Sequence, residues 1–387
     1  MAAAFATIGS ILGGAMLALA ALGCLYAMLA AGVIRSFFAQ RTAIARRGAA
    51  VTILKPLHGA EPRLAENLAG FLDQDYDGPV QLLCGVQRAD DPAIAAVEAL
   101  RVRFPKARID LVVDATAHGA SGKISNLINM DVRAAHPIVV MSDSDMVVGP
   151  DYLTRVLSAL DAPGVGAVSC LYRGRGDAGF WSRLGASGLS YQFLPGAIFG
   201  VAKGLARPCM GSTIALRRET LDRIGGFAAF ADVLADDYAI GAAVAALGLR
   251  VAVPPMLVTH ASAEPMFSAL WRHELRWGAT VRDVERVGYV LSVIALPFPI
   301  ALLAMFYWPA TGAGLALLAF LVRARLARTV DRVVGDISAP LWLLPPRDCL
   351  SLAVFVASFF VRSVDWRGAT LRIENHGRVS ADTEFPA

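Results

Sequence analysis

The chain has 387 residues, enough for one large domain with additions or for two domains. Its residues are 56% hydrophobic and 18% charged, a balance shifted from the soluble average toward membrane proteins. The net charge of +4 is not accompanied by a stripe of basic and aromatic residues, which argues against nucleic-acid binding. The five scattered cysteines form no CxxC pair, so we expect reduced cytosolic thiols rather than a zinc site or a disulfide framework.

The first predicted element is a transmembrane helix. No charged residue occurs from Thr7 to Ile34, about 28 residues, whereas roughly 20 span a bilayer core. No basic stretch precedes this run, which is also too long for the apolar region of a signal peptide, so we expect a retained helix within residues 1–48. By the positive-inside rule, the arginines that follow place the next segment in the cytoplasm: Arg35, Arg41, Arg46 and Arg47.

Residues 49–286 are predicted to form a cytoplasmic α/β domain. Short apolar runs typical of buried strands occupy 51–56, 80–86, 109–113, 137–143 and 165–170. Helical patterns lie between them, at about 61–73, 92–104, 121–135 and 151–160. This alternation predicts a doubly wound, mainly parallel sheet, which binds ligands beyond the carboxyl ends of its strands.

Apolar segments return in two places. Residues 180–208 are glycine-rich and carry Arg183, Lys203 and Arg207, which favours a membrane-surface element over a further span. Within 287–387, three runs are candidate spans: Tyr289–Trp308, the shorter Pro309–Val322, and Leu341–Val361, which "PPRD" interrupts. The arginines between the last two runs predict a cytoplasmic loop: Arg323, Arg325, Arg328 and Arg332. The basic C-terminal tail also indicates the cytoplasmic side, so one late segment is a candidate re-entrant segment.

The sequence "VVMSDSDMVV" places Asp143 and Asp145 directly after a strand. Like charges held this close are costly without a cation between them. A hard divalent ion bound by these carboxylates, with diphosphate oxygens completing its coordination, would explain the pair. The alternative is a loop that begins a helix, and the position at the end of a predicted strand favours the metal.

"LADDYAIG" is a second acidic motif. Asp236 and Asp237 begin a helical run, where a carboxylate interacts favourably with the helix dipole. The functional interpretation is a general base that takes a proton from an attacking hydroxyl. The motif alone does not decide between helix capping and catalysis.

"HELRW" (273–277) supplies Arg276, whose fork of donors suits phosphate, and Trp277, whose ring suits a sugar or a lipid. An amphipathic helix at the membrane surface is an equally common origin of such residues. "HGASGK" lacks the first glycine and the final Ser or Thr of a phosphate loop, but Lys123 near a helix N-terminus is a plausible diphosphate contact. Asp91 would bind a nucleoside or precede a helix that starts at Pro92.

The order of these motifs resembles the ceramide glucosyltransferase family of membrane enzymes, which have a GT-A-type nucleotide-sugar domain, three spaced aspartate sites and a (Q/R)xxRW motif. The resemblance runs from "VTILKPLHGAEPRLAENLAGFLDQDY" through "HELRWGATVR" to "DWRGATLRIE", most of the chain. "GKISNLINM", "ARPCMGSTIALRRETLDRIGGF" and "HELRW" look more similar still to the bacterial branch associated with hopanoid biosynthesis. The resemblance implies a GT-A-like sheet with N-terminal and C-terminal transmembrane helices.

The resemblance also implies residue roles. Asp91 would contact the uridine together with Pro56 and Glu61, while Asp143 and Asp145 would hold Mg²⁺ or Mn²⁺ on the diphosphate. Asp237 would be the base, with Asp236 beside it. Arg276 and Trp277 would close the donor or acceptor site. The chain departs from the motif at His273, which stands where the family has Gln or Arg, whereas Asp145 completes an acidic pair that the animal members lack.

The expected activity is transfer of one sugar, with inversion, from UDP-glucose or UDP-N-acetylglucosamine to a ceramide or hopanoid polyol in the bilayer. We expect a multi-pass protein of the bacterial inner membrane. The nearest alternative, a processive polysaccharide synthase, needs a pore that the few predicted spans do not provide. A non-enzymatic membrane receptor or scaffold is the alternative of another class, and a transporter is disfavoured because the charges cluster outside the spans.

Overall fold

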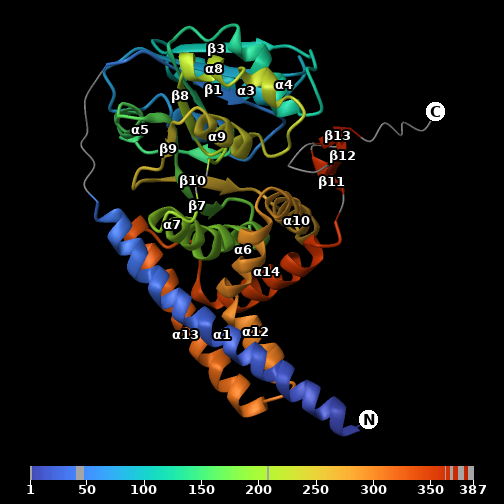
Figure 1. The fold of residues 1–387 in the computed structure, drawn as a ribbon. Coiled ribbons are helices and arrows are strands. Elements are labelled where there is room, and N and C mark those ends of the chain that lie inside the picture. Colours follow the sequence, from blue (N-terminus) through green and yellow to red (C-terminus); the bar gives the residue numbers. More distant parts are fainter. Residues whose placement is uncertain are drawn as a thin grey trace, which may run out of the picture. The chain divides into compact units, whose positions relative to one another are not determined.

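The computed structural model describes residues 2–40, 48–206, 209–361, 363–366, 369–373 and 379–381 (Figure 1). Contacts divide the chain into two compact units. The sheet unit contains Gln40–Tyr172, Ala206–Ala263 and Arg362–Ala387, and the helical unit contains Met1–Ala39, Arg173–Leu205 and Glu264–Val361. Four residues used in the predictions of membrane placement lie outside the described residues: Arg41, Arg46, Arg47 and Arg207. The range 49–286 remains the predicted extent of the cytoplasmic domain.

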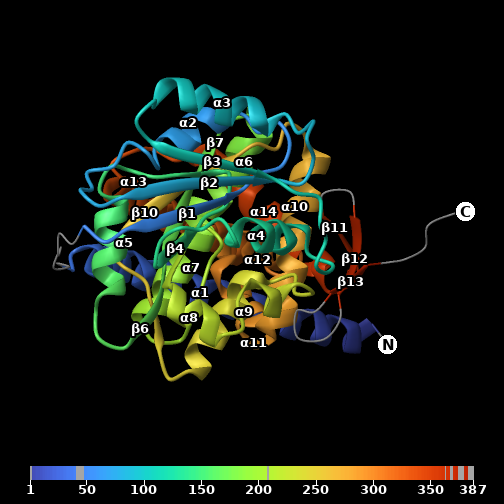
Figure 2. The same ribbon diagram turned by 90° about the horizontal axis from the view of Figure 1, so that it is seen from above.

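A seven-stranded sheet in the order β3-β2-β1-β4-β8-β6-β9 forms the centre of the sheet unit (Figure 2). Its strands are β1 (Val51–Pro56), β2 (Val80–Val86), β3 (Arg108–Val113), β4 (Ile138–Met141), β6 (Val165–Ser169), β8 (Ile214–Arg217) and β9 (Arg250–Ala252). β1 pairs in parallel with β2 and β4, β2 with β3, and β6 with β9, while β8 is antiparallel to β4 and β6. The predicted mainly parallel sheet is confirmed.

Helices cover both faces of this sheet because successive strand side chains point to opposite faces. On one face Ile53 packs with residues of α2, α3 and α5, and on the other Leu54 packs with residues of α4, α8 and α9. These helices are α2 (Leu64–Ala69), α3 (Ala93–Arg103), α4 (Gly122–Asp131), α5 (Tyr152–Leu160), α8 (Arg218–Arg223) and α9 (Asp236–Ala246). The fully buried pattern of β1 is therefore that of a strand covered on both sides.

Shorter elements complete the sheet unit. β5 (Met146–Val147) and β10 (Leu257–Ser262) pair antiparallel, with His260 opposite Met146. β7 (Leu171–Gly176) begins in this unit and continues into the helical unit. A 3₁₀ helix, η2, spans Phe227–Phe230, and β11 (Ser363–Trp366), β12 (Ala369–Ile373) and β13 (Val379–Ala381) form an antiparallel sheet.

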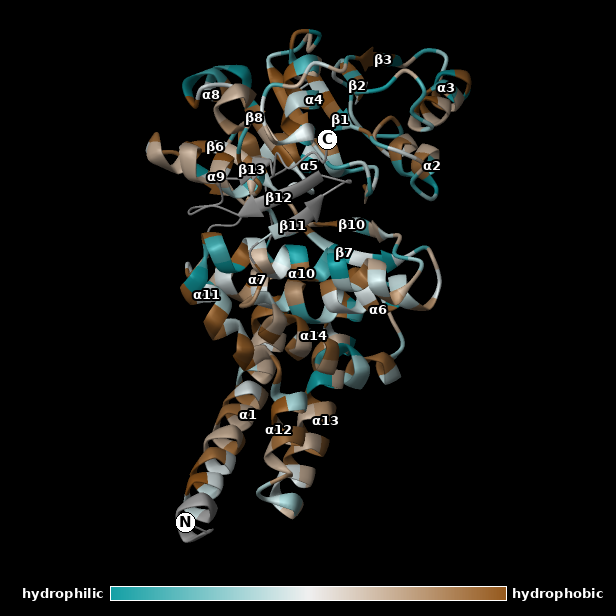
Figure 3. Cartoon of the chain, turned by 90° about the vertical axis from the view of Figure 1, so that its right-hand side faces the viewer, coloured by the Kyte–Doolittle hydropathy of each residue, from teal (hydrophilic) through white to brown (hydrophobic). Residues whose placement is uncertain are grey.

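The helical unit contains the candidate membrane spans. Among the described residues, three helical stretches are long and apolar enough to cross a membrane: Thr7–Phe38, Pro309–Val334 and Leu341–Ser358. They correspond to α1 (Ala2–Phe38), to α13 (Pro309–Val334), and to η4 (Leu341–Leu343) with α14 (Leu344–Ser358). Figure 3 shows α1, α12 (Pro297–Ala304) and α13 as predominantly hydrophobic.

The predicted span Tyr289–Trp308 is broken in its middle. α11 (Arg286–Leu291) and η3 (Ser292–Ala295) precede the break, α12 (Pro297–Ala304) follows it, and the two parts are bent by 68°. Leu296 lies at the break with non-helical dihedrals, because a residue before proline disfavours the helical region. This segment is therefore a broken span or a re-entrant loop.

The loop predicted at the four arginines is wrong, because α13 continues through Arg323, Arg325, Arg328 and Arg332 to Val334. Their cytoplasmic placement stays a prediction. Arg323 is 2% exposed, and its guanidinium donates to both carboxylate oxygens of Asp348 at 3.0 and 2.8 Å. A charge that is paired and hydrogen-bonded in this way can be buried in a helix. The interrupting "PPRD" supplies this partner, and its prolines occupy the first turn of α14, where no donor is lost.

Residues 180–202 form three consecutive helical segments: α6 (Phe180–Gly188), a π-helical turn η1 (Leu189–Phe193) and α7 (Leu194–Ala202). α7 packs against α1, with the Tyr26 and Phe199 rings 5.3 Å apart. These segments belong to the helical unit. The placement of this stretch at the membrane surface stays a prediction.

Candidate active site

The carboxylates of the "DSD" motif lie just past β4, in the middle of the sheet. The Asp143 N–H donates to the Gly211 carbonyl at 3.1 Å, and Lys55 Nζ donates to the Asp143 carbonyl at 2.7 Å, so both contacts help to hold this turn. The side chains of Asp143 and Asp145 are 34% and 33% exposed. The turn thus presents two fixed, accessible carboxylates at a strand end, the ligand-binding edge of such sheets.

Lys123, in the first turn of α4, joins the two acidic motifs. Its Nζ lies 2.8 Å from Asp143 Oδ1 and 3.1 Å from Asp236 Oδ2. Burial by itself lowers the pKa of Lys123, but the carboxylates of Asp143, Asp236 and Asp237 outweigh it and raise the pKa above the ordinary value. One ammonium group therefore faces three carboxylates, and the cluster has an excess of negative charge.

Gly211 connects the same two motifs through its backbone. Its carbonyl accepts from the Asp143 N–H, and its own N–H donates to Asp237 Oδ2 at 2.9 Å. A Cβ at this position would lie 2.5 Å from Asp143 Oδ2. A side chain here would displace the Asp143 carboxylate, so the glycine of "CMGST" lets this segment link the two acidic motifs.

Asp236 and Asp237 occupy the first turn of α9. Asp236 is 4% exposed, and Asp237 also accepts the Tyr238 N–H through Oδ1 at 2.8 Å. Burial raises the pKa of both carboxyls, and the ammonium of Lys123 opposes this shift. Both carboxyls thus lie at the helix terminus, as the capping interpretation requires. Their raised pKa also moves them toward the range of a general base.

His260 is a site residue that no motif in the sequence marks. The pairing of β10 with β5 places its Nε2 3.1 Å from Asp145 Oδ2, and the next residue, Ala261, donates its N–H to the Asp145 carbonyl at 2.8 Å. The Tyr172 ring lies 6.0 Å from the imidazole. Because strand register alone creates this contact, no local pattern could have predicted it.

Lys55 is a second residue absent from the predictions, directly before Pro56 at the end of β1. It is fully buried, its Nζ lies 3.5 Å from the centroid of the Phe71 ring, and burial lowers its pKa to about 7 against the pull of Asp143 and Asp145. Lys55 supports the acidic turn through its hydrogen bond to the Asp143 carbonyl. A lysine inside the apolar run "VTILKP" was the signal, since lysine is almost never fully buried without a partner.

Two of the predicted uridine contacts, Glu61 and Asp91, already have partners within the protein. Glu61 Oε1 accepts from Ser144 Oγ at 2.6 Å, which ties the loop after β1 to the "DSD" turn. Asp91 is 7% exposed and accepts the N–H groups of Gly59 and Ala93, both at 2.9 Å. Asp91 therefore binds the first N–H of α3, which begins at Ala93, one residue after the start that the alternative interpretation predicts. Contact of these residues with uridine stays a prediction.

The donor set is compatible with a divalent ion. Within the described ranges, no group of three or more His, Cys, Asp or Glu side chains forms a metal cage. Mg²⁺ usually needs no such cage, because one or two carboxylates together with water and substrate phosphates complete its coordination. Asp143 and Asp145 are partly exposed oxygen donors, and His260 lies beside Asp145, so these residues would hold Mg²⁺ or Mn²⁺.

Arg276 and Trp277 belong to the helical unit, on α10 (Phe267–Val284). The rings of His273 and Trp277 lie 4.3 Å apart, and His273 Nδ1 hydrogen-bonds to Glu264. His273, which replaces Gln or Arg of the family motif, thus has an acidic partner and an aromatic neighbour in its own unit. The part of Arg276 and Trp277 in the site stays a prediction.

Comparison with solved structures identifies the fold class. The mannosyltransferase PcManGT from Pyrobaculum calidifontis, solved in complex with GDP-Man and Mn²⁺, is 20% identical in sequence and has a TM-score of 0.56. The match covers 90% of this chain and 98% of that one. The sheet unit therefore has the GT-A-type fold that the resemblance implies.

Sequence comparisons identify the family. Glycosyl transferase family 21 matches residues 15–379, so the chain belongs to this family. Ceramide glucosyltransferase 3 of Caenorhabditis elegans is 26% identical over 241 residues, 59% of this chain and 49% of the relative. Ceramide glucosyltransferase 1 of the same organism is 24% identical over 232 residues, 59% and 48% of the two chains. The chain spans about half the length of these curated relatives.

Proposed function

We propose that the protein is an inverting hexosyltransferase that moves one sugar from a UDP-sugar to a hydroxyl of a membrane lipid. The donor is UDP-glucose or UDP-N-acetylglucosamine, and the acceptor is a ceramide or a hopanoid polyol. Membership of glycosyl transferase family 21 and the ceramide glucosyltransferase relatives support sugar transfer to a lipid. The observation that carries the proposal is the junction of the two acidic motifs at Lys123 and Gly211.

In this proposal the diphosphate of the donor binds beside the "DSD" turn. Asp143 and Asp145 hold the divalent ion, and Lys123 lies where its ammonium group can pair with a phosphate oxygen. A bound Mg²⁺ or Mn²⁺ supplies Lewis-acid stabilisation of the charge on the departing diphosphate. The similar mannosyltransferase structure contains a nucleotide sugar and Mn²⁺, which agrees with this ligand class.

Asp237 is the proposed base. The lipid hydroxyl gives its proton to the Asp237 carboxylate while its oxygen forms a bond to the anomeric carbon of the sugar. The bond from that carbon to the diphosphate oxygen breaks on the opposite face, and UDP leaves with the bonding electrons. Gly211 holds Asp237 next to the backbone of Asp143, so the base and the leaving-group site keep a fixed separation.

Product analysis tests this function. The full chain in lipid nanodiscs is supplied with each UDP-sugar, each acceptor lipid and Mg²⁺ or Mn²⁺, and products are analysed by mass spectrometry. We expect UDP release with one sugar added to one acceptor class and inverted configuration at the new bond. A polymeric product would instead identify a processive synthase. Absence of UDP release with every pair would favour a receptor or scaffold and refute the proposal.

The proposed placement is a multi-pass protein of the bacterial inner membrane with the sheet unit in the cytoplasm. The three candidate spans and the broken fourth segment support a membrane location. Reporter fusions after Gln40 and at the C-terminus test the sidedness. Activity of a cytoplasmic reporter at both positions is expected, and activity of a periplasmic reporter after Gln40 would contradict it.

A further inference from the structure

α14 has two chemically different faces. One face is buried and carries Arg347, Asp348, Ser351, Val354 and Ser358. The other is exposed and carries Cys349, Ala353 and Val356. Spacings of three and four residues place each set on its own side of the helix.

The buried face of α14 is fastened to α10, the helix that carries "HELRW". Arg347 donates through both terminal nitrogens to the two carboxylate oxygens of Glu274, which lies inside the motif. Further along, Arg282 of α10 donates to the Ser358 carbonyl. Gly278 of α10 leaves room for the Tyr289 hydroxyl, which an added Cβ would approach to 2.8 Å and which donates to Ser358 Oγ at 2.9 Å. A buried bidentate pair and a close helix contact make α10 and α14 one rigid piece.

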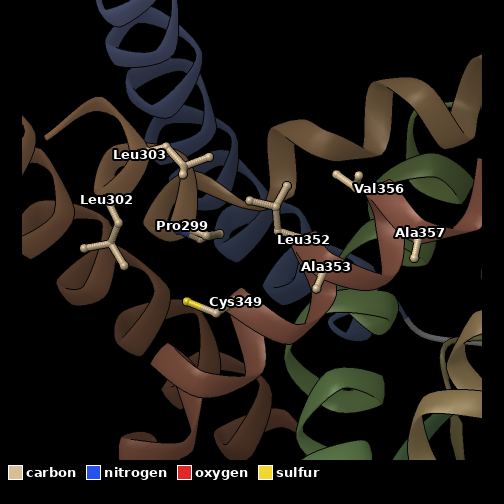
Figure 4. Close-up of a pocket in the computed structure, with 8 residues that line it drawn as sticks. All are labelled: Pro299, Leu302, Leu303, Cys349, Leu352, Ala353, Val356 and Ala357. Atoms are coloured by element: carbon tan, nitrogen blue, oxygen red, sulfur yellow. The ribbon is translucent and has the colours of Figure 1, made fainter. Parts of the chain in front are cut away.

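The other face of α14 lines an apolar groove of about 500 Å³ (Figure 4). Pro299, Leu302 and Leu303 of α12 form one wall, and Cys349, Leu352 and Ala353 belong to the α14 wall. Every described residue that lines the groove is uncharged. Its volume is within the range of sites that bind small molecules, about 300–1,000 Å³.

We propose that this groove binds the hydrocarbon part of the acceptor lipid, an inference that rests on the proposed function. A lipid hydroxyl must be held in one position to react efficiently, and hydrocarbon is the largest contact surface that such a lipid offers. The groove lies between segments apolar enough for a bilayer, and two of its lining residues, Leu303 and Val356, are 40% and 51% exposed. Because α14 is fastened to α10, a lipid in this groove has a fixed position relative to His273, Arg276 and Trp277.

A substitution that fills the groove tests the proposal. Ala353→Phe adds a ring at an exposed position of the α14 wall, and Ala313→Phe makes the same change at an exposed position of α13 outside the groove. In nanodiscs we expect Ala353→Phe to raise KM for the accepted ceramide or hopanoid polyol about tenfold or more. UDP affinity should stay at the wild-type value, and Ala313→Phe should change neither constant. Equal KM values for the two variants would overturn the proposal.

A second measurement does not depend on turnover or on any variant. A ceramide and a hopanoid polyol, each with a photoreactive group in the hydrocarbon, are cross-linked to the wild-type chain and mapped by mass spectrometry. We expect labelling of Pro297–Ala304 and Leu344–Ser358 that is competed by the unmodified acceptor and not by phosphatidylglycerol. Labelling that phosphatidylglycerol competes equally, or that falls equally on Ala313, means bulk lipid only and overturns the groove. Competed labelling without sugar transfer would refute the proposed function and keep the groove.

Discussion

The two units both contain buried charges, and they balance them differently. In the helical unit each of two buried arginines has its own carboxylate: Arg323 pairs with Asp348, and Arg347 pairs with Glu274. Both pairs use two hydrogen bonds, which satisfy both carboxylate oxygens. Such balanced pairs need no further ion, so their role is to join α13, α14 and α10.

In the sheet unit the carboxylates around Lys123 outnumber this cation. Lys123 is the cation between Asp143 and Asp236, and Asp237 adds a third carboxylate to the same environment. The cluster is partly open, because about a third of the Asp143 side chain is exposed. Excess negative charge at an open strand end favours the entry of a further cation. The comparison therefore separates charges that hold the fold from charges that are placed for a ligand.

The largest expected effect follows from removing the base. Asp237→Asn should reduce kcat by about 10²–10⁴-fold, because a positioned general base contributes that much. UDP affinity should remain close to wild type, because Asp143 and Asp145 are unchanged. Product formation by mass spectrometry and UDP binding by calorimetry measure the two effects separately.

Asp232→Asn is the matched control for this variant. Asp232 is an exposed aspartate of the same unit, and it too accepts a backbone N–H, that of Ala120 at 2.8 Å. This control should keep near-normal kcat. Near-normal turnover by Asp237→Asn as well would show that the base assignment is wrong.

A stability effect of similar size is expected in the helical unit. Arg323→Met leaves the Asp348 carboxylate buried without its cation, which should lower the free energy of unfolding by about 3–5 kcal/mol. The double variant Arg323→Met with Asp348→Leu should recover most of this loss, because an apolar pair of similar volume is often tolerated. Thermal unfolding in nanodiscs measures both.

Arg173→Met is the control for a pair that is not buried. Arg173 bonds to Asp336 in the same unit, where the aspartate side chain is 63% exposed. Its loss should change stability by less than about 1 kcal/mol. If Arg323→Met and Arg173→Met lowered the free energy of unfolding equally, the distinction between buried pairs and surface pairs would be wrong.

Local patterns predicted the sheet and the acidic turn correctly, because their signals lie in neighbouring residues. The run "PIVVMSDSD" contains both the strand and the carboxylates that follow it. The prediction of a loop at Arg323 was wrong because the outcome at this arginine depends on a residue that is distant in the sequence. Its partner Asp348 lies in another helix, so charge alone suggested a loop where pairing allows a buried helix.

The same limit explains the site residues that no motif marked. His260 reaches Asp145 through the register of β5 and β10, and Gly211 reaches Asp143 and Asp237 through a turn before β8. These contacts depend on how distant segments pair, and the hydrophobic periodicity of a single segment does not encode that pairing. Resemblance to the family indicated Asp237 as the base, and the structure shows that the Gly211 N–H donates to its carboxylate.

The excess of carboxylates in the sheet unit predicts that removing Asp143 weakens metal-dependent UDP binding. Asp143→Ala should weaken UDP binding in the presence of Mg²⁺ or Mn²⁺ by about 10–100-fold, a loss found even for groups that only support a metal ligand. Calorimetry with the metal and with a chelator measures the difference. Asp151→Ala, at an exposed aspartate of the same unit, should leave binding unchanged. Unchanged metal-dependent binding by Asp143→Ala would remove its metal role.

The smallest expected effect is on the pH profile. Burial raises the pKa of Asp237 above the ordinary aspartate value of 3.8, and only the deprotonated carboxylate can accept the proton of the lipid hydroxyl. As pH falls through this raised pKa, kcat should therefore decline about tenfold per pH unit, starting at a higher pH than for an ordinary aspartate.

UDP affinity measured across the same pH range separates this loss from a change at the diphosphate site. If the base is responsible, kcat at saturating donor and acceptor declines while UDP affinity is still constant. A decline of kcat and UDP affinity together would assign the loss to the diphosphate site instead of Asp237. A flat kcat down to the ordinary value of 3.8 would show that burial does not raise the pKa of the base in the working protein.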